Sequence, residues 1–204
     1  MDGPKALRCY GPGLFGWGRY QERWRFDFNG HALVNADGTV LVVDPIEPTS
    51  EELSEIKGLG ETFVVVLLNA DHERAARAVA QQLGASIWAP LADIDRLKDQ
   101  SVETYESGHE FPGGWVAQTM CDLKTPGETV LHHAERRVLV VGDALVGDPV
   151  NGMRLVPPVK IPDHDRAMRS VAGLLDFDFD ALLLSDGYCL PQGGKAVVRA
   201  FVSR

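Results

Sequence analysis

Three acidic residues follow apolar segments of the chain, and one of them has a histidine beside it. In chain order they are Asp71 with His72 after residues 63–68, Asp143 after 138–141, and Asp186 after 182–184. Carboxylate and imidazole groups are ligands for divalent metal ions and are also general acids and bases. Each acid taken singly also fits a helix cap or a turn. Their joint occurrence after buried strands favours one shared polar site.

The elements that must position these residues are predicted as alternating strands and helices. Residues 63–68 form a continuous apolar, β-branched run, which is typical of a strand that is covered on both faces. A helix at 72–83 and a strand at 85–89 complete a β–α–β unit. The second half has a hairpin at 128–141, a helix at 165–175, a strand at 181–184 and a helix at 194–202. We predict an α/β protein with a single domain, 1–204, built from two similar halves.

Composition limits the classes of protein to consider. The chain has 204 residues, a formal net charge of −9 and 45% apolar residues, which suits a domain with a sizeable core. The acidic surplus argues against a nucleic-acid partner. No apolar run is long enough for a membrane span and no leader opens the chain, so we expect no membrane association. Cys9, Cys121 and Cys189 lack CxxC spacing and fit free thiols, which predicts a cytoplasmic protein.

Four short segments carry a resemblance to a known family. In chain order they are Leu67-Leu-Asn69-Ala-Asp71-His72, Thr125-Pro-Gly127-Glu-Thr, Arg137-Val-Leu-Val-Val-Gly-Asp143 and Leu182-Leu-Leu-Ser-Asp186-Gly187. Their order and spacing resemble the metallo-β-lactamase superfamily from about Trp24 to the C-terminus. The resemblance implies a four-layer αβ/βα sandwich, in which two mixed β-sheets carry helices on their outer faces. It also implies a site at one edge, between the two sheets.

The resemblance implies a metal motif that this chain keeps only in part. In the superfamily the motif is His-x-His-x-Asp-His, a histidine just before Thr-Pro-Gly, an aspartate after a hairpin and a final His-Gly. Asp71, His72 and Asp143 match it, whereas the four replaced histidines are Leu67, Asn69, Lys124 and Asp186. Leucine cannot bind a metal, an amide is a weak ligand and an ammonium repels a divalent cation. These residues argue against a binuclear zinc centre.

One hypothesis retains a single divalent metal. The resemblance assigns its ligands to Asp71, His72, Asp143 and Asp186, which supply three oxygens and one nitrogen. Such a set suits Zn, Mn or Fe. The ion would lower the pKa of a bound water for hydrolysis, and Lys124 would stabilise the developing oxyanion. Asp71 and Lys124 are then the candidate catalytic residues.

A second hypothesis, which we favour, is a metal-free relative in which Lys124 replaces the cation. Three carboxylates and one ammonium give the pocket a charge of −2, and protonation of His72 brings it to −1. Because burial of like charges is costly, a carboxyl must hold a proton or a further donor must approach. The candidate donors are Asn69, Arg74 and a ligand. Hydrolysis is then lost, and the pocket is structural or binds an unidentified small molecule; its lining is Asn69, His72, Asp143 and Asp186.

A third hypothesis is association without catalysis. The segment Gly11–Gly18 is rich in glycine and aromatic residues, but it lacks the strand before it and the helix after it that a nucleotide-binding loop needs. We predict that residues 1–20 form an irregular segment, where Phe15 and Trp17 pack on a partner or line the mouth of a pocket. Because members of the superfamily commonly dimerise, the resemblance also allows a homodimer.

Overall fold

The structure is a computed structural model that describes residues 6–98, 100–150 and 152–204. Its strands are β1 (Arg8–Gly11), β2 (Leu14–Gln21), β3 (Phe26–Val34), β4 (Thr39–Val43), β5 (Thr62–Val66), β6 (Ser86–Pro90), β7 (Glu103–Tyr105), β8 (Glu110–Phe111), β9 (Trp115–Thr119), β10 (Thr129–His133), β11 (Val138–Val141), β12 (Val146–Asp148), β13 (Gly152–Arg154) and β14 (Ala181–Leu184). Its helices are α1 (Ser50–Lys57), α2 (Ala76–Leu83), α3 (His164–Ala172) and α4 (Gly194–Val202), with short 3₁₀ turns η1 (Ala70–His72), η2 (Leu91–Arg96), η3 (Pro158–Lys160) and η4 (Gly173–Asp176). None of the helices in the described part of the chain combines the length and the apolar character that crossing a membrane requires.

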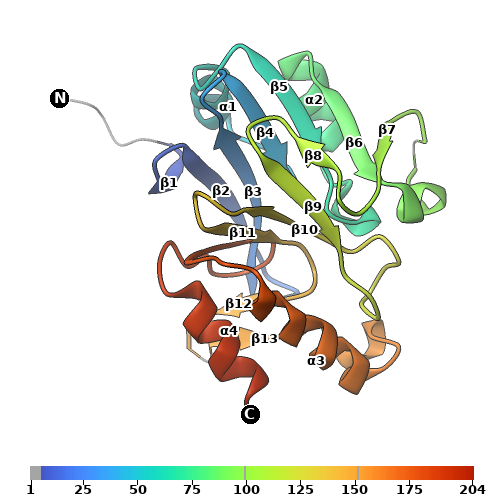
Figure 1. Ribbon diagram of the computed structural model, residues 1–204. Helices are drawn as coiled ribbons and strands as arrows, with labels where there is room; N and C mark the ends of the chain where they lie inside the picture. The colour runs from blue at the N-terminus through green and yellow to red at the C-terminus, as the bar shows by residue number, and fades with distance from the viewer. Residues whose placement is uncertain (1–5, 99, 151) are drawn as a thin grey trace.

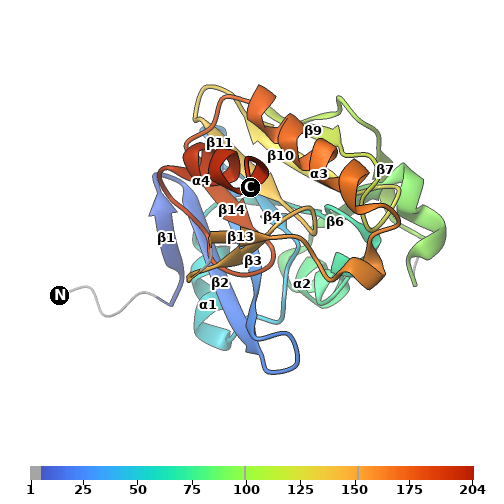
Figure 2. The same ribbon diagram turned by 90° about the horizontal axis from the view of Figure 1, so that it is seen from below.

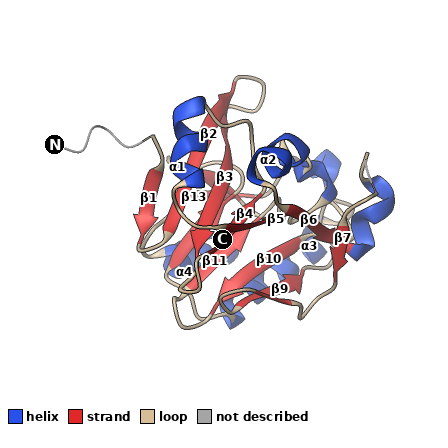
Figure 3. Ribbon diagram, turned by 90° about the horizontal axis from the view of Figure 1, so that it is seen from above, coloured by secondary structure: helices blue, strands red, loops and turns tan. Residues whose placement is uncertain are grey.

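Two mixed β-sheets lie at the centre of the molecule (Figure 1). The larger sheet has the order β1-β2-β3-β4-β5-β6-β7, with antiparallel pairs as far as β4 and parallel pairs beyond it. The smaller sheet has the order β14-β11-β10-β9-β8, where β11 and β14 are parallel and the other pairs antiparallel. Helices α1 and α2 cover the larger sheet, and α3 and α4 cover the smaller one (Figures 2 and 3). This arrangement confirms the predicted αβ/βα sandwich.

The apolar runs of β4 and β5 build two separate parts of the core. Successive side chains on a strand point to opposite faces of its sheet. Val42 and Val65 belong to the apolar cluster beneath α1 and α2, whereas Leu41 and Val66 belong to the cluster between the sheets, which includes Leu183. Both faces of these strands are therefore covered, and this explains why the runs lack an alternation of apolar and polar residues.

The helix predicted at residues 72–83 is interrupted in the structure. The 3₁₀ turn η1 ends at His72, and α2 begins only at Ala76. Arg74, between them, has a φ of 29°, a left-handed value that a right-handed α-helix excludes. Because of this interruption, Arg74 lies outside α2, and its side chain takes part in the polar site described below.

The prediction of an irregular segment at residues 1–20 is wrong for its described part, which begins at Ala6; residues 1–5 lie outside the described residues. This part forms β1 and β2, and Gly13, with a φ of 67°, turns the chain between them. Trp17 is only 1% exposed, and its Nε1 donates to the Ile46 carbonyl at 3.1 Å. A Cβ at Gly30 would lie 2.5 Å from the Trp17 ring, so only glycine leaves room for it. Trp17 belongs to the apolar cluster beneath α1 and α2, and Phe15 packs against it.

Candidate functional site

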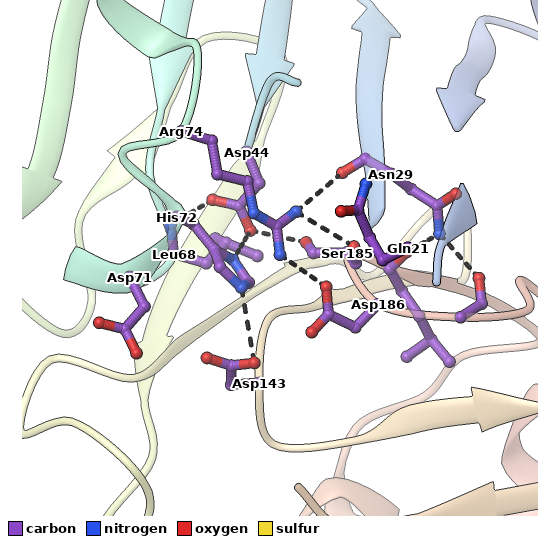
Figure 4. A network of polar contacts seen from close by, with 12 residues as sticks. Gln21, Asn29, Asp44, Leu68, Asp71, His72, Arg74, Asp143, Ser185 and Asp186 are labelled. Atoms are coloured by element: carbon purple, nitrogen blue, oxygen red, sulfur yellow. Dashed lines mark hydrogen bonds and ion pairs between the residues drawn. The ribbon is translucent and has the colours of Figure 1, made fainter. Parts of the chain in front are cut away.

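The polar residues of the site lie at the ends of strands from both sheets (Figure 4). Asp44 directly follows β4, and His72 ends the turn η1 that comes after β5. Asp143 and Asp186 each lie two residues beyond their strands, β11 and β14. Because β4 is parallel to β5 and β11 is parallel to β14, the carboxyl ends of each pair meet at one edge, where polar side chains escape the apolar core.

His72 lies at the centre of the site and is 1% exposed. Its Nδ1 lies 2.6 Å from Asp44 Oδ2, an oxygen that also accepts from the Ser185 hydroxyl at 2.6 Å. Asp44 Oδ1 accepts from the Leu68 amide at 2.8 Å. On its other side, His72 Nε2 faces Asp143 Oδ1 at 3.6 Å and makes no hydrogen bond within the described residues. Burial disfavours the charged ring, but the two carboxylates outweigh burial and raise the pKa of His72 to about 10.

Lys124 lies between two carboxylates. Its Nζ is 2.5 Å from Asp71 Oδ2 and also bonds Asp143 Oδ2. The side chains of Lys124 and Asp143 are 12% and 2% exposed, whereas that of Asp71 is 52% exposed. Burial opposes the ammonium charge, but Asp143 and Asp71 raise the pKa of Lys124 above its usual value. Burial likewise opposes the charge of Asp143, but His72 and Lys124 hold its pKa well below the usual range. The site therefore contains a buried ammonium–carboxylate pair.

Arg74 brings a second side-chain cation to the site (Figure 4). Its Nη2 donates to Asp186 Oδ1 at 2.6 Å, and its Nη1 lies 3.3 Å from the Ser185 carbonyl and 3.5 Å from the Asn29 carbonyl. The guanidinium also lies over the Phe28 ring, 4.1 Å from its centroid. Burial raises the pKa of Asp186, and the charge of Arg74 opposes that rise. Of the donors that the sequence offered to balance the acids, Arg74 is the one that contacts Asp186.

Asn69 and Glu128 form a third part of the site. Asn69 Nδ2 donates to Glu128 Oε2 at 3.1 Å, and Glu128 Oε1 accepts from the Asp143 amide at 2.7 Å. The Asn69 Oδ1 atom has no hydrogen-bond partner among the described residues. Burial and the neighbouring Asp143 carboxylate raise the pKa of Glu128 well above its usual value. Leu67, the first position of the motif, is an apolar core residue with 1% exposure.

The structure brings together three of the four residues that the sequence offered as metal ligands. His72, Asp143 and Asp186 have ligand atoms within 4.8 Å of one another, and all three residues are buried. Asp71 lies outside this group and pairs with Lys124.

Sequence reasoning missed two carboxylates of the site, Asp44 and Glu128. Asp44 is the only residue between the apolar strand β4 and Pro45. An acid at the end of an apolar strand was the sequence feature that could have identified it as a site residue. Glu128 directly follows the Thr125-Pro-Gly127 segment. The motif comparison considered only Lys124, on the other side of that segment, whereas Glu128 is the residue that bonds Asn69.

The comparisons with known proteins agree with this architecture. A family model described as the metallo-beta-lactamase superfamily matches residues 5–204. The chain belongs to the metallo-beta-lactamase superfamily. No curated protein gives a significant match to the sequence.

Solved structures of superfamily members share the fold at low identity. The DIM-1 metallo-beta-lactamase exposed to ceftazidime has a TM-score of 0.76 and 14% identity over 97% of this chain and 95% of its own. The enzyme from Pontibacter korlensis has a TM-score of 0.75 and 12% identity over 97% and 98% of the two chains. The enzyme from Hirschia baltica has a TM-score of 0.68 and 13% identity over 97% of each chain. At this identity the likeness establishes the fold only.

Proposed function

We propose that this member of the superfamily works without a metal ion and that its site serves to bind a small molecule rather than to hydrolyse one through zinc. The observation that carries the proposal is Lys124, whose ammonium bonds both Asp71 and Asp143. A divalent ion on Asp143 would lie beside this positive charge, and the two would repel each other. Arg74 holds Asp186 in the same way, at 2.6 Å.

The donor set does not fit a binuclear zinc centre. Leu67 supplies no ligand atom, and Asn69 and Glu128 are bonded to each other at 3.1 Å. Zinc prefers nitrogen and sulfur ligands, and the described site contains a single imidazole, that of His72. Side-chain cations also offset most of the acidic charge, because the four aspartates of the site face His72, Arg74 and Lys124. The protein's own residues thus compensate much of the charge that metal ions would otherwise compensate.

A mononuclear metal site is the second candidate, and one observation favours it. His72 Nε2 is buried without a hydrogen bond while Asp44 holds Nδ1 at 2.6 Å, an arrangement that commonly orients a metal-binding imidazole. His72, Asp143 and Asp186 would hold the ion, which would supply Lewis-acid activation of water. Lys124 and Arg74 already hold one oxygen each of Asp143 and Asp186, so the ion would lie beside two side-chain cations that repel it, which is why we place this candidate second.

Metal content distinguishes the two candidates directly. The protein is purified without chelator and its zinc, manganese and iron are measured by mass spectrometry, before and after incubation with each ion and dialysis. We expect less than about a tenth of an equivalent of each ion in both samples. Retention of close to one equivalent after dialysis would refute the metal-free proposal and support the mononuclear site.

A variant adds a positive test of the same reasoning. Lys124→Ala removes the ammonium and leaves Asp143 and His72 in place. If Lys124 excludes the ion, this variant should bind zinc more tightly than the parent chain in a calorimetric titration. Arg137→Gln is the matched control, because Arg137 forms an exposed ion pair with Asp178 and lies at the opposite end of β11 from Asp143. Equal and tight zinc binding by the parent and Lys124→Ala would contradict the role given to Lys124.

A further inference from the structure

A cavity of about 880 Å³ lies beside the polar site, and neither hypothesis about the metals uses it. Its walls come from β1, the end of the β2–β3 hairpin, the β12–β13 ribbon and the segment Gly187–Cys189. Gly187 lines the cavity and directly follows Asp186, so the cavity adjoins the site. Its volume lies in the range of pockets that hold small organic ligands.

Aromatic and apolar side chains are unusually exposed in this cavity. Five large hydrophobic side chains are exposed in the described part of the chain, and three of them line this one cavity: Tyr20 at 56%, Val150 at 87% and Tyr188 at 54%. Trp24 and Phe26 also line it. Exposed apolar surface that gathers in one concave place, rather than scattering singly, marks a binding site.

The charge of the cavity is opposite to that of the chain. Three arginines line it against two aspartates, although the chain as a whole has a net charge of −9. Arg8 is already paired with Asp27 at 3.0 Å. The guanidinium of Arg154 lies over the Phe26 ring, 5.0 Å from its centroid. Within the described residues neither Arg154 nor Arg25 forms an ion pair, so both are available to an anion.

We propose that this cavity binds an organic anion that combines a carboxylate or phosphate group with an aromatic body. Guanidinium groups bind either anion through paired N–H donors, so Arg25 and Arg154 would hold the charged end. The aromatic side chains of Tyr20, Trp24 and Tyr188 would stack on the ring, because offset and edge-to-face ring pairs are favourable. The inference deepens the proposed binding function by naming the ligand class.

The test uses four naphthalene probes that differ only in the attached group: 2-naphthoate, 2-naphthyl phosphate, 2-naphthylmethanol and 2-naphthylmethylammonium. Each is titrated calorimetrically into the full chain at low salt with EDTA present. We expect one saturable site for the two anions, with affinity at least about tenfold higher than for the neutral alcohol and higher still than for the cation. Preference for either anion supports the inference and tells a carboxylate ligand from a phosphate ligand.

Variants locate the binding. Arg154→Gln and Arg25→Gln should each weaken 2-naphthoate by about tenfold, while Arg154→Lys should recover part of the loss. Arg166→Gln is the control, because Arg166 is an exposed helix arginine paired with Asp122 away from the cavity lining. Circular dichroism checks that each variant is folded.

Two results would overturn the inference: equal affinity for the alcohol and the anions, or no saturation of 2-naphthoate up to millimolar concentration. An equal loss in Arg166→Gln and Arg154→Gln would also overturn it. The metal content of the same preparation, measured before EDTA is added, separates this failure from that of the proposed function. A zinc-loaded chain that binds 2-naphthoate through Arg154 would refute only the metal-free proposal. A zinc-free chain that ignores the anions would refute only the ligand class.

Discussion

Replacement of Lys124 by methionine tests the charge balance of the site. The variant keeps most of the side-chain volume and removes the ammonium that bonds Asp143, a carboxylate only 2% exposed. Loss of one partner from a buried ion pair costs about 3–5 kcal/mol, because the other charge stays buried without compensation. His72 still faces Asp143 at 3.6 Å, so we expect the lower end of that range, about 3 kcal/mol. For a chain of this size the melting temperature should fall by roughly 6–12 °C.

The two carboxylates on Lys124 supply the control. Asp143→Asn removes the buried partner and Asp71→Asn removes the half-exposed one, 52% exposed, from the same ammonium. Exposed ion pairs contribute at most about 1 kcal/mol, so Asp71→Asn should have a small effect. Urea unfolding at neutral pH with EDTA present measures all the variants, including the double variant Lys124→Met with Asp143→Asn. The free energy of unfolding that the double variant loses should be smaller than the sum of the losses in the two single variants by about 1–3 kcal/mol.

Three outcomes would refute the reasoning. A loss below about 1 kcal/mol for Lys124→Met would mean that the ammonium does not compensate Asp143. An equal loss for Asp71→Asn and Asp143→Asn would mean that burial does not decide the strength of the pair. Additive losses in the double variant would show that Lys124 and Asp143 do not interact.

Three further predictions concern other parts of the fold. Arg74→Gln should destabilise the chain by about 2–4 kcal/mol in urea unfolding, because it leaves the buried Asp186 without its cation; a change below about 1 kcal/mol would contradict this. Burial lowers the pKa of His31 from 6.5 to about 4, so between these pH values the unfolded chain binds a proton that the folded chain does not. Stability should therefore fall as the pH drops through this window, and His31→Gln should lose roughly 3 kcal/mol of that dependence in unfolding curves at several pH values; an unchanged pH profile would argue against it. Gly30→Ala should lower the melting temperature sharply, because its Cβ would lie 2.5 Å from the Trp17 ring, whereas Gly173→Ala, with no atom within 4 Å, should have little effect in the same thermal scan.

Much of the fold can be read from the sequence, because strands that are covered on both faces have a distinctive local pattern. The runs at Val40–Val43 and Ala181–Leu184 are apolar throughout, and the structure contains the strands β4 (Thr39–Val43) and β14 (Ala181–Leu184) there. The acids that follow such strands could also be placed at one edge, since the carboxyl ends of neighbouring parallel strands meet there. The first strands were missed because glycine and aromatic residues in the segment Gly11–Gly18 hide the alternation that places Trp17 in the core.

The pairing of charges in the site was beyond the reach of the sequence. A count over Asp71, Asp143, Asp186 and Lys124 leaves an excess of negative charge. The structure adds one acid, Asp44, and one cation, Arg74, so the count does not change, and what the structure decides is which groups pair: the partner of Arg74, Asp186, is 112 positions away in the chain. The chain leaves helical geometry at Arg74, which has a φ of 29°. Because residues other than glycine seldom adopt a positive φ, the residue type at this position does not predict the interruption.

The amino-acid sequence by itself determined the alternating strands and helices and the kinds of residue that follow the strands, because strands covered on both faces leave continuous apolar runs; the resemblance to the superfamily implied the sandwich. Tertiary structure decided which charges meet: Lys124 between Asp71 and Asp143, and Arg74 on Asp186. The physical reason is that the energy of an ion pair depends on a separation of a few ångströms and on the exposure of both groups. Neither quantity is set by spacing along the chain, so the ion pairs of the site form only when the two sheets come together.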